Sequence, residues 1–129
     1  MIKILIVDDD AALCSLLKNF LQKNSIESDC LYNGEEALML LLSPECTCYD
    51  LILMDVSMPG KSGLEVLRAV RANAIGIPVI MLSGSTDPED KFEALKYAAD
   101  DYVRKPCDQR ELVTRIDAVL RRAKTVSEG

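Results

Sequence analysis

The chain of 129 residues contains no histidine, which narrows the chemistry that it can perform. Without an imidazole it cannot supply a histidine base, a histidine nucleophile or a histidine-ligated zinc site. Long hydrophobic runs are also missing. The longest run, residues 37–42, is less than a third of the roughly 20 residues that a bilayer-spanning helix needs, so no transmembrane segment is expected. The acidic residues 8–10 end the apolar start of the chain before it reaches the length of a secretory signal.

Basic residues are in the minority, and the formal net charge is −6. Binding a phosphate backbone requires clustered Lys and Arg, so any contact with DNA is expected through a separate domain. The five cysteines are scattered and odd in number, which favours free thiols in a reducing cytoplasm. Cys46 and Cys48 lack the two-residue spacer and the second ligand pair of a typical metal site. The apolar fraction of 49% and the chain length fit one globular domain.

Short apolar runs alternate with helical patterns along the chain. Strands are expected at residues 2–7, 26–31, 51–54, 77–82 and 101–104, each followed by a helical pattern, the last ending near residue 122. Capping patterns at Asn33, Ser62, Asp87 and Asp108 mark the start of four helices. This alternation predicts an α/β fold: a flavodoxin-like, doubly wound parallel sheet of five strands in the order 2-1-3-4-5, with five helices.

Polar and charged side chains directly follow four of the expected strands. They are Asp8, Asp9 and Asp10 after the first, Asp55 after the third, Ser83 after the fourth and Lys105 after the fifth. In such a sheet, ligands bind at the carboxyl ends of the strands, near the switch between strands 1 and 3. Helix capping explains one acid, and we assign it to Asp10. It does not explain two further acids, a fourth on the neighbouring strand and a lysine.

Clustered carboxylates at one sheet edge are unfavourable unless positive charge compensates them. Mg²⁺ prefers one or two carboxylates, water and phosphate oxygens, so it is the expected ion. Lys105 adds a second positive charge and Ser83 a hydroxyl donor, a combination suited to phosphoryl transfer. Asp55 is the expected nucleophile, because it alone ends a central strand beside this ion site.

Four segments resemble the receiver domain of two-component response regulators. They are ILIVDDD at residues 4–10, LILMDVSMPG at 51–60, PVIMLSG at 78–84 and DDYVRKP at 100–106. The resemblance implies a receiver domain over residues 1–122, with 123–129 as the start of a linker or tail. It also implies that Asp55 accepts a phosphoryl group from a partner histidine kinase or phosphotransfer protein. The implied role is that of a signalling domain with slow self-dephosphorylation, and not that of an enzyme.

The resemblance also assigns roles within the site. The implied Mg²⁺ ligands are Asp8 (through water), Asp9, Asp55 and the backbone carbonyl of Ser57. Lys105 and Ser83 are implied to contact the phosphoryl group, and the Lys105–Pro106 peptide bond is implied to be cis. Tyr102 matches the aromatic switch residue, whose ring moves inward when Ser83 is drawn to the phosphoryl group.

A further set of residues resembles the output face of the OmpR/PhoB-type winged-helix transcription regulators, formed by the fourth helix, the fifth strand and the fifth helix. The set is Lys91, Leu95, Asp100, Asp101, Glu111, Val113, Arg115 and Arg122. The resemblance implies a homodimer on phosphorylation, with pairs such as Lys91–Glu111 and Asp101–Arg115 crossing between protomers. DNA would be reached only through a separate output domain. The same charges also fit solvated helix faces.

Three positions depart from the family pattern. Ala98 replaces a usual glycine, so a strained or shifted turn is expected there. Cys107 replaces a usual phenylalanine. Tyr97 replaces a frequent acid, which weakens the dimer prediction.

Three alternative functions stay open. One is a stand-alone receiver that signals by binding proteins, and another is a degenerate receiver that switches without phosphate. The third is a Mg²⁺-dependent hydrolase, which commonly needs an acid where this chain has Ser57.

Overall fold

A parallel five-stranded sheet forms the centre of the molecule, in a computed structural model that describes the backbone of residues 1–128 and the side chains of residues 1–123. The strands are β1 (Lys3–Val7), β2 (Glu27–Leu31), β3 (Leu51–Asp55), β4 (Val79–Ser83) and β5 (Asp101–Arg104). Their spatial order is β2-β1-β3-β4-β5, and every neighbouring pair is parallel. The predicted fold class and strand order are therefore confirmed.

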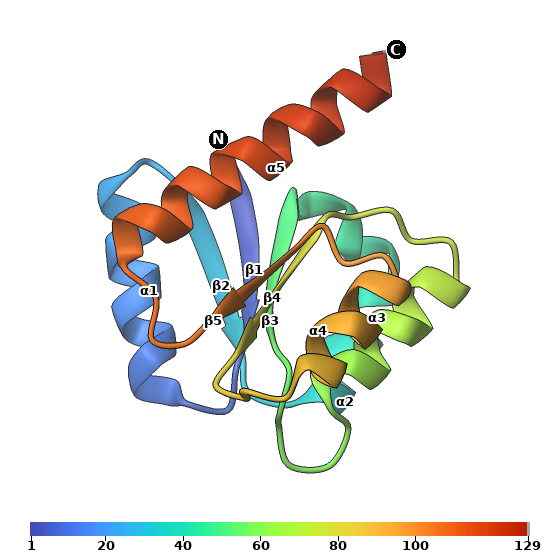
Figure 1. Ribbon diagram of the computed structural model, residues 1–129. Helices are drawn as coiled ribbons and strands as arrows, with labels where there is room; N and C mark the ends of the chain where they lie inside the picture. Colours follow the sequence, from blue (N-terminus) through green and yellow to red (C-terminus); the bar gives the residue numbers. More distant parts are fainter. Residues whose placement is uncertain (129) are drawn as a thin grey trace.

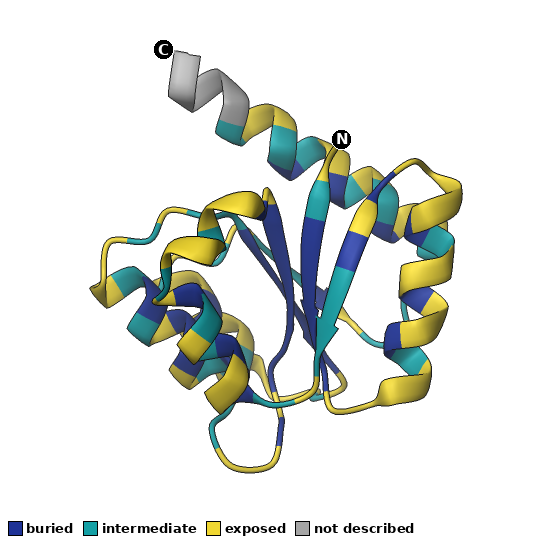
Figure 2. Ribbon diagram, turned by 180° about the vertical axis from the view of Figure 1, so that it is seen from behind, coloured by how far each residue is buried: buried dark blue, intermediate teal, exposed yellow. Residues whose placement is uncertain are grey.

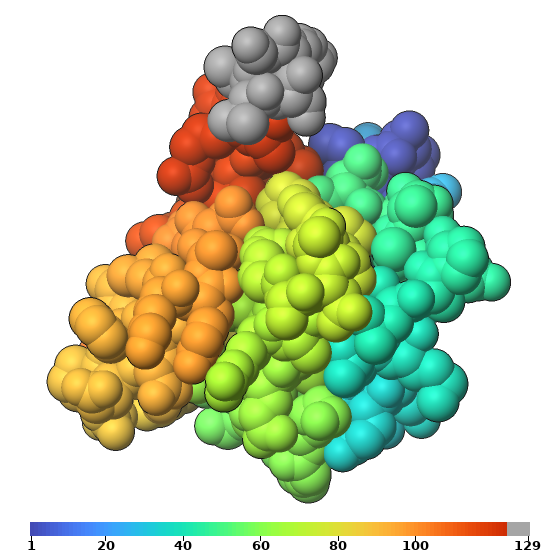
Figure 3. All heavy atoms as spheres, turned by 90° about the vertical axis from the view of Figure 1, so that its right-hand side faces the viewer, coloured from blue at the N-terminus to red at the C-terminus, as the bar shows by residue number. Residues whose placement is uncertain are grey.

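Five α-helices cover the two faces of this sheet. They are α1 (Ala11–Lys23), α2 (Gly34–Leu41), α3 (Gly63–Ala72), α4 (Pro88–Lys96) and α5 (Gln109–Glu128). Figure 1 shows α1 and α5 on one face and α2, α3 and α4 on the other. In the space-filling view of Figure 3 the latter three helices lie side by side. Among the described residues, no helix is both long and apolar enough to cross a membrane.

Helix α5 runs past Arg122, where the sequence predicted its end, to Glu128. The tail predicted from residue 123 therefore begins inside this helix, and its last residue, Gly129, lies outside the described residues. Whether residue 122 also bounds the domain stays a prediction.

The central strands are buried because they contact helices on both faces. Every residue of β3 and β4 is buried, as the dark blue strands of Figure 2 show. Successive side chains of a strand point to opposite faces, so the core divides into two clusters. Leu5, Ile52 and Met81 face α2, α3 and α4, whereas Ile6, Leu53 and Ile80 face α1 and α5. This packing holds the ends of the strands in a fixed register.

The helix starts follow the capping patterns of the sequence. Asp10 accepts a hydrogen bond from the backbone N–H of Leu13, and Ser62 forms a complete capping box with Glu65. The connection between α2 and β3, where the sequence predicted no element, contains a short 3-10 helix, η1 (Pro44–Cys48). The backbone therefore coils tightly between Ser43 and Tyr49.

Ala98 adopts a left-handed backbone conformation, with φ of +64°. It lies just beyond α4, where the N–H of Ala98 bonds to Leu95 and the N–H of Ala99 bonds to Ala94. This is the Schellman pattern, in which glycine is usual because a Cβ strains the left-handed conformation. The expectation of a strained turn at Ala98 is confirmed. Ala74 ends α3 in the same way, with φ of +58°.

Ala98→Gly is expected to raise the free energy of unfolding by about 0.5–1 kcal/mol, because relief of the strain exceeds the extra chain entropy of glycine. The Ala98 side chain is exposed, so its removal leaves no cavity. Urea denaturation would measure the change. Ala72→Gly is the matched control at an exposed helical position, where a loss of about 0.5–1 kcal/mol is expected. A lower free energy of unfolding for Ala98→Gly than for the wild type would contradict the strain.

Candidate functional site

Three carboxylates meet at the carboxyl ends of β1 and β3. Oxygens of Asp8, Asp9 and Asp55 all lie within 4.8 Å of one another. Asp8 is 1% exposed and Asp55 is 6% exposed, whereas Asp9 is open to solvent. The predicted cluster therefore forms, with two members inside the protein and one at its surface.

Lys105, at the end of β5, reaches across to this cluster. Its ammonium lies 2.7 Å from Asp8 Oδ2 and 3.2 Å from Asp55 Oδ1. The Lys105–Pro106 peptide bond is cis, as predicted. Because one ammonium faces three carboxylates, the site keeps an excess of negative charge.

Burial and charge repulsion act directly on Asp55. Burial, with the neighbouring charge of Asp8, raises the pKa of Asp55 to about 6, although Lys105 acts in the opposite direction. Burial lowers the pKa of Lys105, but its hydrogen bond to Asp8 and the charge of Asp55 outweigh this, so the net shift is upward. Lys105 thus stays cationic near neutral pH, and Asp55 carries a charge that its surroundings only partly compensate.

The donor atoms fit a hard divalent cation. All three side chains offer oxygen, which Mg²⁺ prefers, and the exposed Asp9 leaves room for water ligands. Asp8 Oδ1 accepts a hydrogen bond from the backbone N–H of Asp10 (2.9 Å), which fixes the carboxylate orientation. Ser57 is exposed and lies in the loop that follows β3, between the buried residues Val56 and Met58. The cluster is therefore suited to Mg²⁺, and the excess negative charge gives a physical reason to bind it.

Ser83 and Tyr102 lie on the neighbouring strands β4 and β5. Ser83 is 1% exposed and ends β4, and its hydroxyl oxygen accepts a hydrogen bond from the backbone N–H of Ser85 (3.0 Å). The Tyr102 hydroxyl is buried and has no hydrogen-bond partner among the described residues. An unpartnered buried hydroxyl is costly, so a second position that satisfies it would be favoured. The role of the two residues as a switch stays a prediction.

The residues predicted for the dimer lie on α4, β5 and α5, but several already have partners within the chain. Arg115 lies 3.0 Å from Asp101 Oδ2 and 3.1 Å from Glu111 Oε1. Lys91 and Leu95 are exposed on α4. The predicted crossed pair of Asp101 and Arg115 is thus found within one protomer, and for it to cross between two protomers these partners would have to be exchanged.

Sequence reasoning missed Arg71, whose guanidinium joins the loop between α3 and β4 to the turn between α4 and β5. It donates hydrogen bonds to the carbonyls of Ile75 (2.7 Å), Ile77 (2.9 Å) and Ala98 (3.2 Å), and it lies 3.2 Å from Asp100 Oδ2. Asp100 also accepts from the backbone N–H of Val79 (2.8 Å). The carboxylate of this predicted dimer residue is therefore engaged inside the chain. A basic residue in the last turn of a helix was the available signal, because such residues often bind terminal carbonyls.

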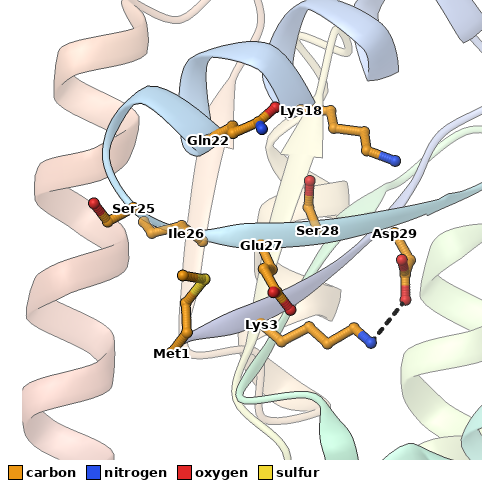
Figure 4. A pocket seen from close by; sticks show the side chains of 9 residues that line it. All are labelled: Met1, Lys3, Lys18, Gln22, Ser25, Ile26, Glu27, Ser28 and Asp29. Atoms are coloured by element: carbon orange, nitrogen blue, oxygen red, sulfur yellow. Dashed lines mark ion pairs between the residues drawn. The ribbon is translucent and has the colours of Figure 1, made fainter.

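A cavity of about 320 Å³ lies at the opposite, amino-terminal end of β1 and β2. Figure 4 shows Lys3 of β1 reaching Asp29 of β2 beside it, an ion pair of 3.4 Å, with Lys18 and Gln22 of α1 across the opening. None of the residues that line it belongs to the carboxylate cluster. The residues of the predicted site therefore lie at the other, carboxyl-terminal end of the strands.

Comparisons with known proteins agree with this geometry. Residues 4–117 match the response regulator receiver domain family. The transcriptional regulatory protein CpxR of Escherichia coli K12 is 45% identical over 123 residues, which are 95% of this chain and 51% of that protein. The transcriptional regulatory protein ResD of Bacillus subtilis is 39% identical over 125 residues, covering 97% of this chain and 50% of that protein. The chain thus spans about half the length of these curated relatives.

Solved structures of receiver domains superimpose closely on this chain. The receiver domain of the Francisella response regulator 1452 superimposes with a TM-score of 0.86 at 34% identity, covering 95% of this chain and 99% of that one. A response regulator receiver domain from Clostridium thermocellum superimposes with a TM-score of 0.89 at 28% identity, covering 98% of this chain and 99% of that one. Both comparisons cover nearly the whole of each chain.

Proposed function

Because the chain belongs to the response regulator receiver domain family, we propose that Asp55 accepts a phosphoryl group from a partner histidine kinase or phosphotransfer protein. One observation carries the proposal. Asp55 is a buried carboxylate at the end of the central strand β3, close to two further carboxylates and 3.2 Å from the Lys105 ammonium. This arrangement is suited to receiving a phosphoryl group, whose transfer depends on positioning and charge neutralisation.

The reaction uses Asp55 as an oxygen nucleophile. Near neutral pH its carboxyl is mostly ionised, since its pKa is raised only to about 6. One carboxylate oxygen attacks phosphorus, and the phosphorus–nitrogen bond of the donor phosphohistidine breaks. The electron pair of that bond returns to the imidazole, which takes up a proton. Because this chain has no histidine, a phosphohistidine donor lies outside it.

Lys105 and the acidic residues then hold the product. Lys105 Nζ already contacts Asp55 and Asp8, so a small movement brings it to a phosphoryl oxygen. Mg²⁺, bound by Asp8 (through water), Asp9, Asp55 and the Ser57 carbonyl, would supply neutralisation of phosphoryl oxygens. Slow self-catalysed hydrolysis of the acyl phosphate would end the signal.

Ser83 and Tyr102 would report phosphorylation. The Ser83 hydroxyl can donate its proton to a phosphoryl oxygen, which draws it away from the N–H of Ser85. Movement of Ser83 would then favour a second position of the Tyr102 ring, because its hydroxyl has no hydrogen-bond partner among the described residues in the present one. Different contacts in the two states shift an existing equilibrium between conformations.

The output is proposed to be transcriptional. CpxR and ResD are transcriptional regulatory proteins, and this chain corresponds to about half of each. A phosphorylated homodimer would form through α4, β5 and α5, and DNA would be bound only by a separate output domain that follows α5. All five cysteines are free, as expected in the cytoplasm. The alternative is a stand-alone receiver that binds a partner protein through the same face.

Incubation with acetyl phosphate and Mg²⁺ is expected to add one labile phosphoryl group to the wild type and none to Asp55→Asn, because asparagine lacks the nucleophilic oxygen. Intact-mass spectrometry measures both proteins. Glu93→Gln, an exposed carboxylate on α4, is the control for charge and should be modified like the wild type. Equal modification of Asp55→Asn, or none of the folded wild type, would contradict the proposal.

Light scattering after treatment with beryllofluoride separates the two outputs. A shift from monomer to dimer in the wild type, absent in Asp55→Asn, supports the transcription-type dimer. Modification of Asp55 without dimerisation supports the stand-alone receiver.

A further inference from the structure

The segment between β3 and α3, residues 56–62, carries Ser57, whose carbonyl is the proposed backbone ligand of Mg²⁺. Its first residue is bonded to the sheet, and its other end is bonded to that residue. The N–H of Val56 bonds to Leu82 of β4 (2.9 Å), and the N–H of Gly63 bonds back to the carbonyl of Val56 (2.8 Å). Ser57 itself is exposed, so the position of its carbonyl depends on how the rest of the segment is held.

The start of α2 holds the outer side of this segment. The backbone N–H of Lys61 donates a hydrogen bond to Glu35 Oε1 (3.0 Å), although the two residues are 26 positions apart. Gly34 packs so closely that a Cβ there would collide with the carbonyl oxygen of Lys61. Gly60 has φ of +76°, and a Cβ on it would lie 2.9 Å from Glu35 Oε1. Figure 1 shows the segment as the green loop beneath the sheet, beside the start of α2.

Glu35 differs from its neighbour Glu36 in this contact. Both carboxylates are exposed in the first turn of α2, where the helix dipole favours acids. Among the residues whose side chains are described, however, the Glu36 side chain makes no hydrogen bond or ion pair, and its backbone N–H donates to Asn33 Oδ1 (2.8 Å). The contact with Lys61 is therefore a property of position 35 and not of acidity at the helix start.

We propose that Glu35 is a positioning residue for the phosphorylation site: by binding the N–H of Lys61 it holds the segment after β3, and with it the Ser57 carbonyl, in the place that Mg²⁺ requires. This inference rests on the proposed function. Glu35 does not touch the ion. Without its hydrogen bond the segment gains freedom in the metal-free protein, and the binding of Mg²⁺ must then order it at an entropic cost.

Calorimetric titration of the unphosphorylated full chain with Mg²⁺ tests the inference. Loss of one charge-assisted hydrogen bond corresponds to a dissociation constant about fivefold to tenfold higher in Glu35→Ala. Glu35→Gln should stay within about twofold of the wild type, because its amide oxygen still accepts from Lys61. Glu36→Ala removes the same charge one residue away and should also stay within about twofold. Hydrogen exchange at the Lys61 amide should be faster in Glu35→Ala alone.

Two results would overturn the inference. The first is a Mg²⁺ affinity of Glu35→Ala equal to that of the wild type. The second is an equal loss of Mg²⁺ affinity in Glu36→Ala or Glu35→Gln, which would show that the loss of negative charge, and not of the hydrogen bond, causes the effect. Failure of the proposed function looks different, since the wild type would then neither bind Mg²⁺ nor be modified by acetyl phosphate. Because Glu35 is exposed, each variant is expected to fold, and thermal unfolding would verify this.

Discussion

Asp55→Asn is expected to be more stable than the wild type near pH 8 in metal-free buffer, by about 2–3 kcal/mol in the free energy of unfolding. The cause is the environment of Asp55. Burial, with the charge of Asp8 beside it, raises the pKa of Asp55 to about 6. An ionised Asp55 is therefore less favourable in the folded chain than in the unfolded chain, and asparagine removes this penalty.

The pH dependence follows from the direction of the shift. In the unfolded chain Asp55 titrates near 3.9, whereas in the folded chain it titrates near 6. Between these values the folded state binds more protons than the unfolded state, so this group makes stability fall as pH rises. Below about pH 4 both states are protonated and the penalty is absent. The advantage of Asp55→Asn should therefore grow from about pH 4 to pH 6 and stay constant above.

Urea denaturation of both proteins from pH 4 to pH 8 with a chelator would measure this difference. Added Mg²⁺ should reduce it, because the ion stabilises the wild type more than the variant. Glu93→Gln, an exposed carboxylate, is the control and should show little pH-dependent difference. A stability difference that stays flat from pH 4 to pH 8 would show that Asp55 carries no such penalty.

Arg71→Ala is expected to lower the free energy of unfolding by about 2–4 kcal/mol. Its guanidinium bonds to the carbonyls of Ile75, Ile77 and Ala98 and to the carboxylate of Asp100, and its side chain is only 20% exposed. Removal leaves these acceptors without their donor. It also disconnects the end of α3 from the turn between α4 and β5.

Denaturation in urea would measure the loss, with two comparison variants. Arg71→Lys keeps the charge but cannot reproduce the forked hydrogen bonds, so an intermediate loss is expected. Arg68→Ala lies on the same helix but is exposed, with its guanidinium 5.5 Å from the centre of the Tyr97 ring, so a loss of no more than about 1 kcal/mol is expected. Equal losses at positions 68 and 71 would contradict the role given to the network.

The order of the strands and the content of their carboxyl ends could be predicted from the sequence. Apolar runs alternate with helical patterns, and connections between parallel strands are right-handed, so few arrangements remain. Acids after residues 7 and 54 and a lysine after residue 104 therefore had to meet at one edge. The structure places Asp8, Asp55 and Lys105 together there.

Contacts between segments distant in the sequence could not be predicted in the same way. Arg71 and Asp100 are 29 positions apart, and Glu35 and Lys61 are 26 apart. No local pattern relates such residues, because their contact depends on how helices and turns pack. The short helix η1 was missed because its five residues carry no hydrophobic period. The end of α5 was placed too early for a similar reason, since its last turns have no apolar stripe to mark them.

The most direct test of the central claim locates the phosphoryl group on the chain. After incubation with acetyl phosphate and Mg²⁺, borohydride reduction converts an aspartyl phosphate to homoserine, which tandem mass spectrometry of a digest assigns to one position. Homoserine at position 55, with Asp8 and Asp9 unchanged, is the result that we predict. Homoserine at position 8 or 9, or none at position 55 in a protein that has gained a phosphoryl group, would contradict Asp55 as the phosphoacceptor.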